Sequence, residues 1–385
     1  MLASKRRNVY EKRPPMTRLT DARERHKFEV FVEEILASAA DDVPGHLAQL
    51  SVPDPFRLRM KVLYSRETIS SVLDNQQKLG NVHERKPHAF RLDVSVGRTP
   101  SRRVRLPFAI LNAGSPNMFV AIAVCVGEDW QALIRFLDAR YPQLVPVYLS
   151  QRELIGSIKT LRHSTPDLDL RVREMSATEK IETETGKHKR SVREWTDEDL
   201  DNLLIHVEDR RQIINSLRFD FHRRINDKVD VTPTLSCKVT RKAIVEISGK
   251  FAVAWDTVIA DVVAAGAEKL KFFSKRGLRD RNYSASPLAI HFKRQVFDDL
   301  AEVRRFVDVM RKYPHSAYAV EHGNPYAHLQ LSDRYDGSSF ELWAVTSDEI
   351  LVLPRLRATE GAVERLIHYI YDEFREGEVT DAGAA

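Results

Sequence analysis

Cysteine is scarce in this sequence, with two residues in a chain of 385. Cys125 and Cys237 lie far apart, each within an apolar run that favours a β-strand. This arrangement favours two buried, reduced thiols over a disulfide framework or a zinc site. We therefore expect a cytoplasmic protein with no bound metal and no other cofactor.

Long apolar runs are also missing. The most hydrophobic stretch, residues 118–126, is about half of the roughly 20 residues that a membrane-spanning helix needs, so it predicts a buried strand. No apolar region follows the basic residues at the N-terminus, as it would in a secretory signal. The sequence therefore predicts a soluble protein that does not bind membranes.

Motifs that would identify a reaction are absent as well. The sequence has no Gly-rich phosphate loop, no G-x-S-x-G and no H-E-x-x-H. His315, His322 and His328 are close in sequence, but their spacing matches no familiar zinc site. The acidic tract 333–341 contains Asp336–Gly337, which favours a tight turn over a nuclease centre. Sequence alone therefore does not decide whether the protein is an enzyme.

What the chain does have is an uneven distribution of charge. The formal net charge is +5, but residues 1–27 hold nine Lys or Arg and three acids, a net charge of +6. Residues 268–312 also carry +6, from twelve basic and six acidic residues, whereas the chain from Val320 onward carries −8. Basic segments of this kind can contact phosphates, although a charged tail can also simply keep a protein soluble. The cations of the N-terminal segment that we predict to contact nucleic acid are Lys5, Arg6 and Arg7.

A second basic segment mixes cations with aromatic side chains. Phe272, Phe273 and Tyr283 are interspersed in residues 269–283, so their rings could stack on unpaired bases. The alternative, which we favour for the two phenylalanines, is that they close the apolar face of the preceding helix. The cations that we predict to contact nucleic acid here are Lys271, Lys275, Arg276, Arg279 and Arg281.

Apolar periodicity predicts a multidomain fold of the α/β and α+β classes. Residues 118–161 alternate strand, helix, strand and helix, which predicts a βαβα unit with a parallel strand pair in an N-terminal mixed sheet. Residues 316–353 contain three or four short strands between two amphipathic helices, which predicts a C-terminal antiparallel meander flanked by helices. We divide the chain into a basic mobile arm (1–19), an α/β domain (20–175), a polar linker (176–195), a helical and β middle section (196–283) and an α+β domain (284–385).

One short motif has the residue types of a phosphodiesterase. His291, Lys293 and Asp298 have the H-x-K-x4-D spacing, which resembles the motif of the phospholipase D-like phosphodiesterases. In that family the histidine attacks phosphorus, the lysine neutralises phosphate oxygens and the acid supports the site. This chain departs from the family pattern, because no Gly-Ser or Asn follows the motif and no second copy of it occurs. A surface strand followed by a helix cap at Asp298 accounts for the same residues.

These observations support three functions. The first, which we favour, is a non-catalytic, nucleic-acid-associated component of a larger cytoplasmic complex. The second is a phosphodiesterase or nuclease that uses His291, Lys293 and Asp298. The third is a protein-interaction or oligomerisation module, whose acidic C-terminal region could meet a basic segment of a partner or of another copy. We expect a protein partner or a homo-oligomer.

Overall fold

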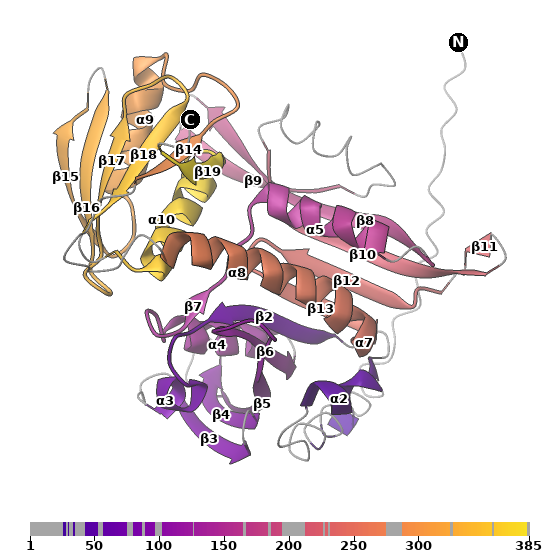
Figure 1. The fold of residues 1–385 in the computed structure, drawn as a ribbon. Coiled ribbons are helices and arrows are strands. Elements are labelled where there is room, and N and C mark those ends of the chain that lie inside the picture. The colour runs from indigo at the N-terminus through magenta and orange to yellow at the C-terminus, as the bar shows by residue number, and fades with distance from the viewer. Residues whose placement is uncertain are drawn as a thin grey trace, which may run out of the picture.

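The structure, a computed structural model, contains two β-sheets and a small number of helices (Figure 1). The larger sheet has thirteen strands and the smaller has six. The expected mixture of helices and strands is confirmed, but every strand pairing within the described part of the chain is antiparallel. The residues that the structure describes are 26–27, 30, 34, 43–52, 57–74, 80–86, 89–96, 102–125, 127–164, 167–183, 186–194, 212–225, 228–229, 232–274, 287–323, 326–355 and 358–382.

The larger sheet is built from the first 250 residues of the chain. Ten strands form one continuous path across it, and three short strands pair beside that path. The short strands are β1 (Ser51–Val52) beside β13, β7 (Val145–Pro146) beside β2 and β11 (Lys228–Val229) beside β10. In order, the path is β3 (Asn81–Lys86), β4 (Ala89–Val96), β5 (Arg102–Asn112), β6 (Met118–Val124), β2 (Leu58–Tyr64), β13 (Ile244–Lys250), β12 (Leu235–Thr240), β10 (Gln212–Ile225), β8 (Leu168–Thr183) and β9 (Gly186–Glu194).

Strand β6 is covered on both faces, as its continuous apolar sequence predicts. Its side chains alternate between two cores: Val120 and Ile122 belong to one, and Ala121 and Ala123 belong to the other. The helices that close these cores lie on opposite faces of the sheet. Helix α4 (Gly127–Asp138) packs into the second core, and helices α5 (Gln151–Ser164) and α8 (Ala260–Ser274) pack into the first.

The predicted parallel strand pair around α4 is wrong. Strands β6 and β7 both pair with β2 and run antiparallel to it, on its two opposite sides. They therefore run in the same direction, but β2 separates them. A strand that is apolar on both faces suits a parallel sheet, and it suits the centre of an antiparallel sheet with helices on both faces equally well.

The long apolar segment predicted at 251–273 is helical, as expected. It consists of α7 (Phe251–Val253), a π-helical segment η1 (Ala254–Ile259) and α8. Figure 1 shows α8 between the larger sheet and the C-terminal part of the chain. Two further helices, α2 (Val43–Ala48) and α3 (Ile69–Asp74), are short, and no described helix is long and apolar enough to span a membrane.

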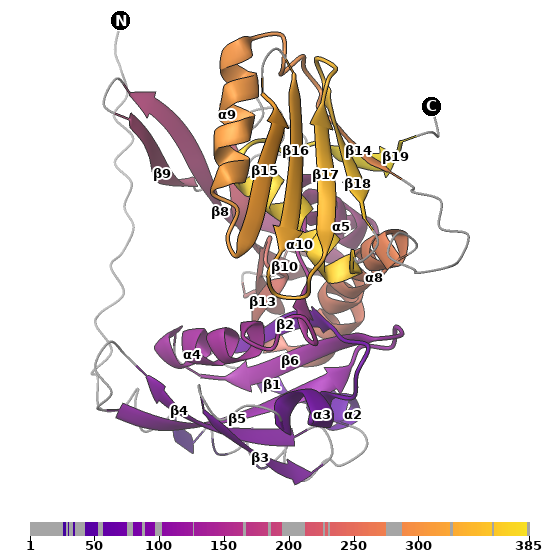
Figure 2. The ribbon, with the colours of Figure 1, turned by 90° about the vertical axis from the view of Figure 1, so that its left-hand side faces the viewer.

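The smaller sheet is antiparallel and carries two helices, as the sequence predicts. Helices α9 (Leu300–Arg311) and α10 (Glu360–Glu373) contribute Phe306 and Leu366 to one core with the sheet. Phe273, at the end of α8, is buried in the same core. Figure 2 shows this sheet with its strands upright, above β2 and β6 of the larger sheet. Its strands, in order, are β15 (Ser316–His322), β16 (Ala327–Asp333), β17 (Ser339–Ala344), β18 (Glu349–Pro354), β14 (Leu288–His291) and β19 (Glu378–Asp381).

The stretch 176–195, predicted to be a polar linker, is largely strand. It contains the second half of β8 and all of β9, which pair from Met175 opposite Glu194 to Thr183 opposite Gly186. Polar composition indicated a loop, but a hairpin at the end of a sheet needs no apolar residues on its exposed face. The predicted arm 1–19 lies outside the described residues, and the division of the chain into domains stays a prediction.

Two glycines test how backbone conformation and close packing contribute to stability. Gly249 has φ +109°, and a Cβ atom there would overlap the carbonyl oxygen of Thr234. Gly114 has φ +78°, but a Cβ atom there would meet nothing within 4 Å. We expect Gly114→Ala to lower the free energy of unfolding by about 1 kcal/mol from conformation alone. Gly249→Ala should lower the free energy of unfolding distinctly more, because steric overlap with Thr234 adds to the conformational cost. Equal losses of unfolding free energy for the two variants in urea would contradict this.

Candidate functional site

The predicted histidine lies at the end of β14. His291 is opposite Glu349 of β18 and Glu378 of β19. Its Nδ1 is 3.5 Å from a carboxylate oxygen of Glu349, and its Nε2 is 3.0 Å from the hydroxyl oxygen of Thr380. The side chain is 43% exposed. A carboxylate beside one ring nitrogen fixes the orientation of a histidine ring, which suits a nucleophile or a general base.

The other two residues of the motif lie in the segment that follows β14. Lys293 and Asp298 are both exposed. The N-cap of α9 is Asp299, whose carboxylate accepts a hydrogen bond of 2.9 Å from the backbone N–H of Ala301. The cap that we considered at Asp298 is therefore wrong by one residue. Joint action of Lys293 and Asp298 with His291 stays a prediction.

Sequence reasoning missed the two side chains that contact His291. Glu349 and Thr380 come from strands far along the chain, and no short motif links them to the histidine. Only the strand order β18-β14-β19 brings the three residues together. The resulting acid–histidine–hydroxyl row has the order of a nucleophilic triad, although its members lie on an open sheet surface.

Most of the cations predicted to contact nucleic acid lie outside the described residues. Lys271 is exposed on α8. Phe273 is buried in the core of the smaller sheet and Phe272 packs against that core, so the interpretation that we favoured for both rings is confirmed. The remaining cations, which lie outside the described residues, are Lys5, Arg6, Arg7, Lys275, Arg276, Arg279 and Arg281.

The clustered histidines of the C-terminal region contact aromatic rings. His322 stacks on Tyr326 with ring centroids 4.0 Å apart, and His328 stacks on Trp343 at 3.6 Å. Within the described ranges, no group of three or more His, Cys, Asp or Glu side chains could hold a metal ion. Asp336 accepts a hydrogen bond from the backbone N–H of Ser338 beside Gly337, so the predicted turn is confirmed.

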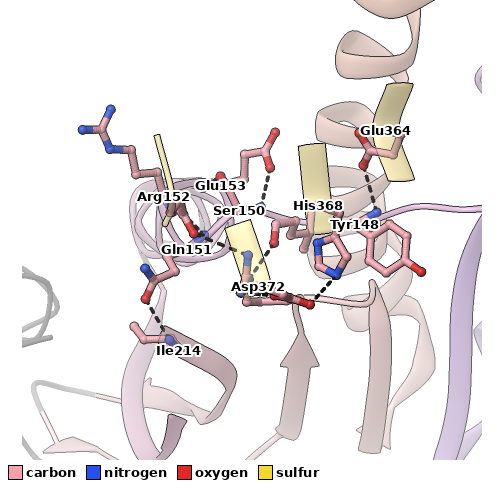
Figure 3. Close-up of polar contacts among 12 residues, drawn as sticks. Tyr148, Ser150, Gln151, Arg152, Glu153, Ile214, Glu364, His368 and Asp372 are labelled. Carbon is pink, nitrogen blue, oxygen red and sulfur yellow. Dashed lines mark hydrogen bonds and ion pairs between the residues drawn. The ribbon is translucent and has the colours of Figure 1, made fainter. Parts of the chain in front are cut away.

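Figure 3 shows a second group of polar side chains, where α10 meets α5. The backbone N–H of Gln151, at the start of α5, donates to both carboxylate oxygens of Glu376, at 2.8 and 3.1 Å. A helix N-terminus is a general anion site, and here the protein supplies the anion itself. The Gln151 side chain accepts a hydrogen bond of 2.7 Å from the backbone N–H of Ile214, which ties α5 to β10.

A buried arginine extends this group toward α10. Arg241, whose side chain is 4% exposed, lies 2.7 Å from Asp372 and 3.5 Å from Glu376. Asp372 also pairs with His368 at 2.9 Å, and the His368 ring stacks on Tyr148 at 3.8 Å. Burial lowers the pKa of His368, although Asp372 opposes that shift. The histidine is therefore held mainly neutral between a carboxylate and an aromatic ring.

Lys269 of α8 completes the group. Its ammonium lies 2.6 Å from the carbonyl oxygen of Tyr148, 2.7 Å from Glu153 and 3.5 Å from Glu364. Burial raises the pKa of Glu364 to about 7, against the opposing effect of Lys269. Burial alone would lower the pKa of Lys269, but Glu364 and Glu153 hold it above its usual value.

These contacts form a joint between the two sheets. Arg241 pairs with Asp372 of α10, and Lys269 pairs with Glu364 of α10 and with Glu153. The start of α5 binds the carboxylate of Glu376, just after α10. We call Glu153, Arg241, Lys269, Glu364, His368, Asp372 and Glu376 the α10 joint. Its anion-binding groups already have protein partners, so the joint serves attachment of the smaller sheet.

No protein-family model matches this sequence, and no curated protein matches it.

The α10 joint predicts a pH dependence of stability that one substitution isolates. Because the folded pKa of Glu364 is raised from 4.5 to about 7, the folded chain holds a proton that the unfolded chain releases in this range. Wild type should therefore lose free energy of unfolding relative to Glu364→Gln as pH rises through that window, by at most about 1.4 kcal/mol per pH unit. Urea unfolding from about pH 5 to about pH 8 measures the difference.

The comparison with Glu364→Gln removes the contributions that both proteins share. The lowered pKa of His368 makes the free energy of unfolding rise with pH at pH values below the usual histidine pKa. The raised pKa of Glu376 makes the free energy of unfolding fall with pH, as Glu364 does. Glu268→Gln, an exposed change next to Lys269, is the matched control and should keep the wild-type profile. Parallel profiles for wild type and Glu364→Gln would contradict the prediction.

Proposed function

We propose that this chain is a protein-interaction component of a larger assembly, and that it binds an extended protein segment along β15. The observation that carries the proposal is an exposed terminal strand without charge in its centre. Ala317, Tyr318 and Ala319 are all exposed, and the side chain of Tyr318 is 48% exposed. In Figure 1, β15 is the outermost strand of the smaller sheet.

The backbone groups that β15 leaves open follow from its pairing with β16. The N–H of Arg334 donates to the carbonyl oxygen of His315, whereas the N–H of Asp333 donates away from β15, to Ser338. Hydrogen-bonded and non-hydrogen-bonded pairs alternate along an antiparallel pair. The register then turns the N–H and C=O groups of three residues outward, namely Ser316, Tyr318 and Val320.

Terminal strands of natural sheets are usually protected by charge, proline or shortness. Ser316–Val320 has neither charge nor proline. The other terminal strands in the described chain, β3, β9 and β19, have charged residues in their sequences or are only four residues long. An uncharged open edge is a template for an added strand, which supports binding by strand addition.

A second function, association with nucleic acid, is supported by the charge distribution. Residues 268–312 carry a net charge of +6, and Lys271, Arg304, Arg311 and Lys312 are exposed in the described part of this block. The contact of His291 with Glu349 favours the related hypothesis of phosphodiester cleavage, because it supports the histidine as a nucleophile. Both hypotheses remain proposals that one assay can separate.

Strand addition predicts that a backbone donor matters more than a side chain. Tyr318→Pro removes an outward N–H without breaking a bond to β16, whereas Tyr318→Ala removes only the ring. We expect Tyr318→Pro to abolish co-purification of partner proteins with the tagged chain from its native cells, and Tyr318→Ala to weaken it. Gln330→Lys, on the neighbouring strand opposite Ala319, is the control. A partner set unchanged in Tyr318→Pro would refute the proposal.

Nucleic-acid association predicts salt-dependent binding. Deleting residues 1–19, or changing Lys275, Arg276, Arg279 and Arg281 to Glu, should weaken binding to DNA or RNA and flatten its salt dependence, because fewer counterions are released. Arg334→Glu, an exposed arginine in the acidic region, is the control. A mobility-shift gel scored also for cleavage, with His291→Ala in parallel, separates binding from hydrolysis. Binding that neither basic variant weakens would contradict this function.

A further inference from the structure

We infer that the segment added to β15 is β15 of a second copy of this chain, running antiparallel about a twofold axis at Tyr318. The inference rests on the proposed function and names its partner. It would join two six-stranded sheets into one continuous sheet.

The outward backbone groups of β15 suit this symmetry. When two copies are centred on Tyr318, the outward groups of Tyr318 face those of Tyr318 in the second copy, and Ser316 faces Val320. Residues that exchange both backbone hydrogen bonds form a pair with twofold symmetry of its own. A twofold interface requires a surface that is complementary to itself, and the outward backbone donors and acceptors of Ser316, Tyr318 and Val320 meet that requirement.

The side chains are compatible with the same register. Tyr318 is opposite the buried Leu331 in the pairing with β16, so it lies on the helix-covered side of the sheet. Two copies would place the Tyr318 rings next to each other, and aromatic cross-strand pairs stabilise sheets. On the other side, Ala317 of each copy would face Ala319 of the other, a small pair that suits the closer spacing of non-hydrogen-bonded positions.

Charge favours this register too. Centring on Tyr318 pairs the uncharged residues 316–320 of one copy with the same residues of the other. A centre at Val320 would bring the charged Glu321 into the contact, opposite Ala319. The chain from Val320 onward carries −8, so two copies should approach best where the strand is uncharged.

Sedimentation velocity of the full chain tests the association. A strand-to-strand contact of this length buries little surface, so the mass should move from 44.2 kDa toward twice that value at concentrations on the order of 100 µM. Tyr318→Pro should weaken association at least about tenfold, because both copies lose an outward donor. Tyr318→Phe and Gln330→Lys should associate like wild type. A wild-type monomer throughout, or association unaffected by Tyr318→Pro, would overturn the inference.

Cysteine cross-linking tests the register. Because Ala317 should face Ala319, a mixture of Ala317→Cys and Ala319→Cys proteins should form a disulfide-linked dimer, at a Cα spacing of about 4.5 Å. Each variant alone should cross-link only to the level of wild type, which carries Cys125 and Cys237. Equal cross-linking of either variant alone would overturn this register.

The same proteins separate failure of this inference from failure of the proposed function. A wild-type chain that stays monomeric but captures a different protein, in a manner that Tyr318→Pro abolishes, overturns the second copy and leaves strand addition standing. A monomer that captures nothing through β15 overturns both.

Discussion

The attachment of α10 by buried charge is the constraint on which the rest of the structure depends. The larger sheet and its helices supply Arg241, Lys269 and the start of α5. These groups bind the carboxylates of Asp372, Glu364 and Glu376, respectively. Charges removed from water are costly unless they are paired, and removing one partner of a buried pair typically costs about 3–5 kcal/mol. The smaller sheet is therefore held in one orientation by pairings that a shifted α10 could not reproduce.

This joint also decides which surfaces are available for binding. The inner side of the smaller sheet is occupied by α9, α10 and the end of α8, so these three helices leave uncovered the opposite face and the terminal strands β15 and β19. His291 lies on the open face with Glu349 and Thr380, and Tyr318 lies at the open edge. The two proposed sites, at His291 and at β15, therefore lie on different strands of one sheet.

The sequence predicted the parts of this arrangement that depend on local pattern. The meander at 316–353, the helix at 251–273 and the burial of Phe273 all follow from apolar residues at strand or helix spacing. The parallel pair around α4 was wrong because β2, sixty residues earlier, inserts between β6 and β7. Residues 186–194, whose polar composition indicated a loop, form a strand because pairing with β8 supplies the backbone hydrogen bonds.

The features of the proposed sites also divide into those that the sequence determined and those that the tertiary structure decided. By itself, the sequence determined that His291 lies in a strand, that the basic and acidic segments are far apart along the chain, and that residues 316–320 carry no charge. Only the tertiary structure decided that Glu349 and Thr380 flank the histidine, that β15 is a terminal strand, and that Glu364 is buried against Lys269. The physical reason is that strand order and burial arise from contacts between distant segments, whereas periodicity and charge are properties of each segment alone.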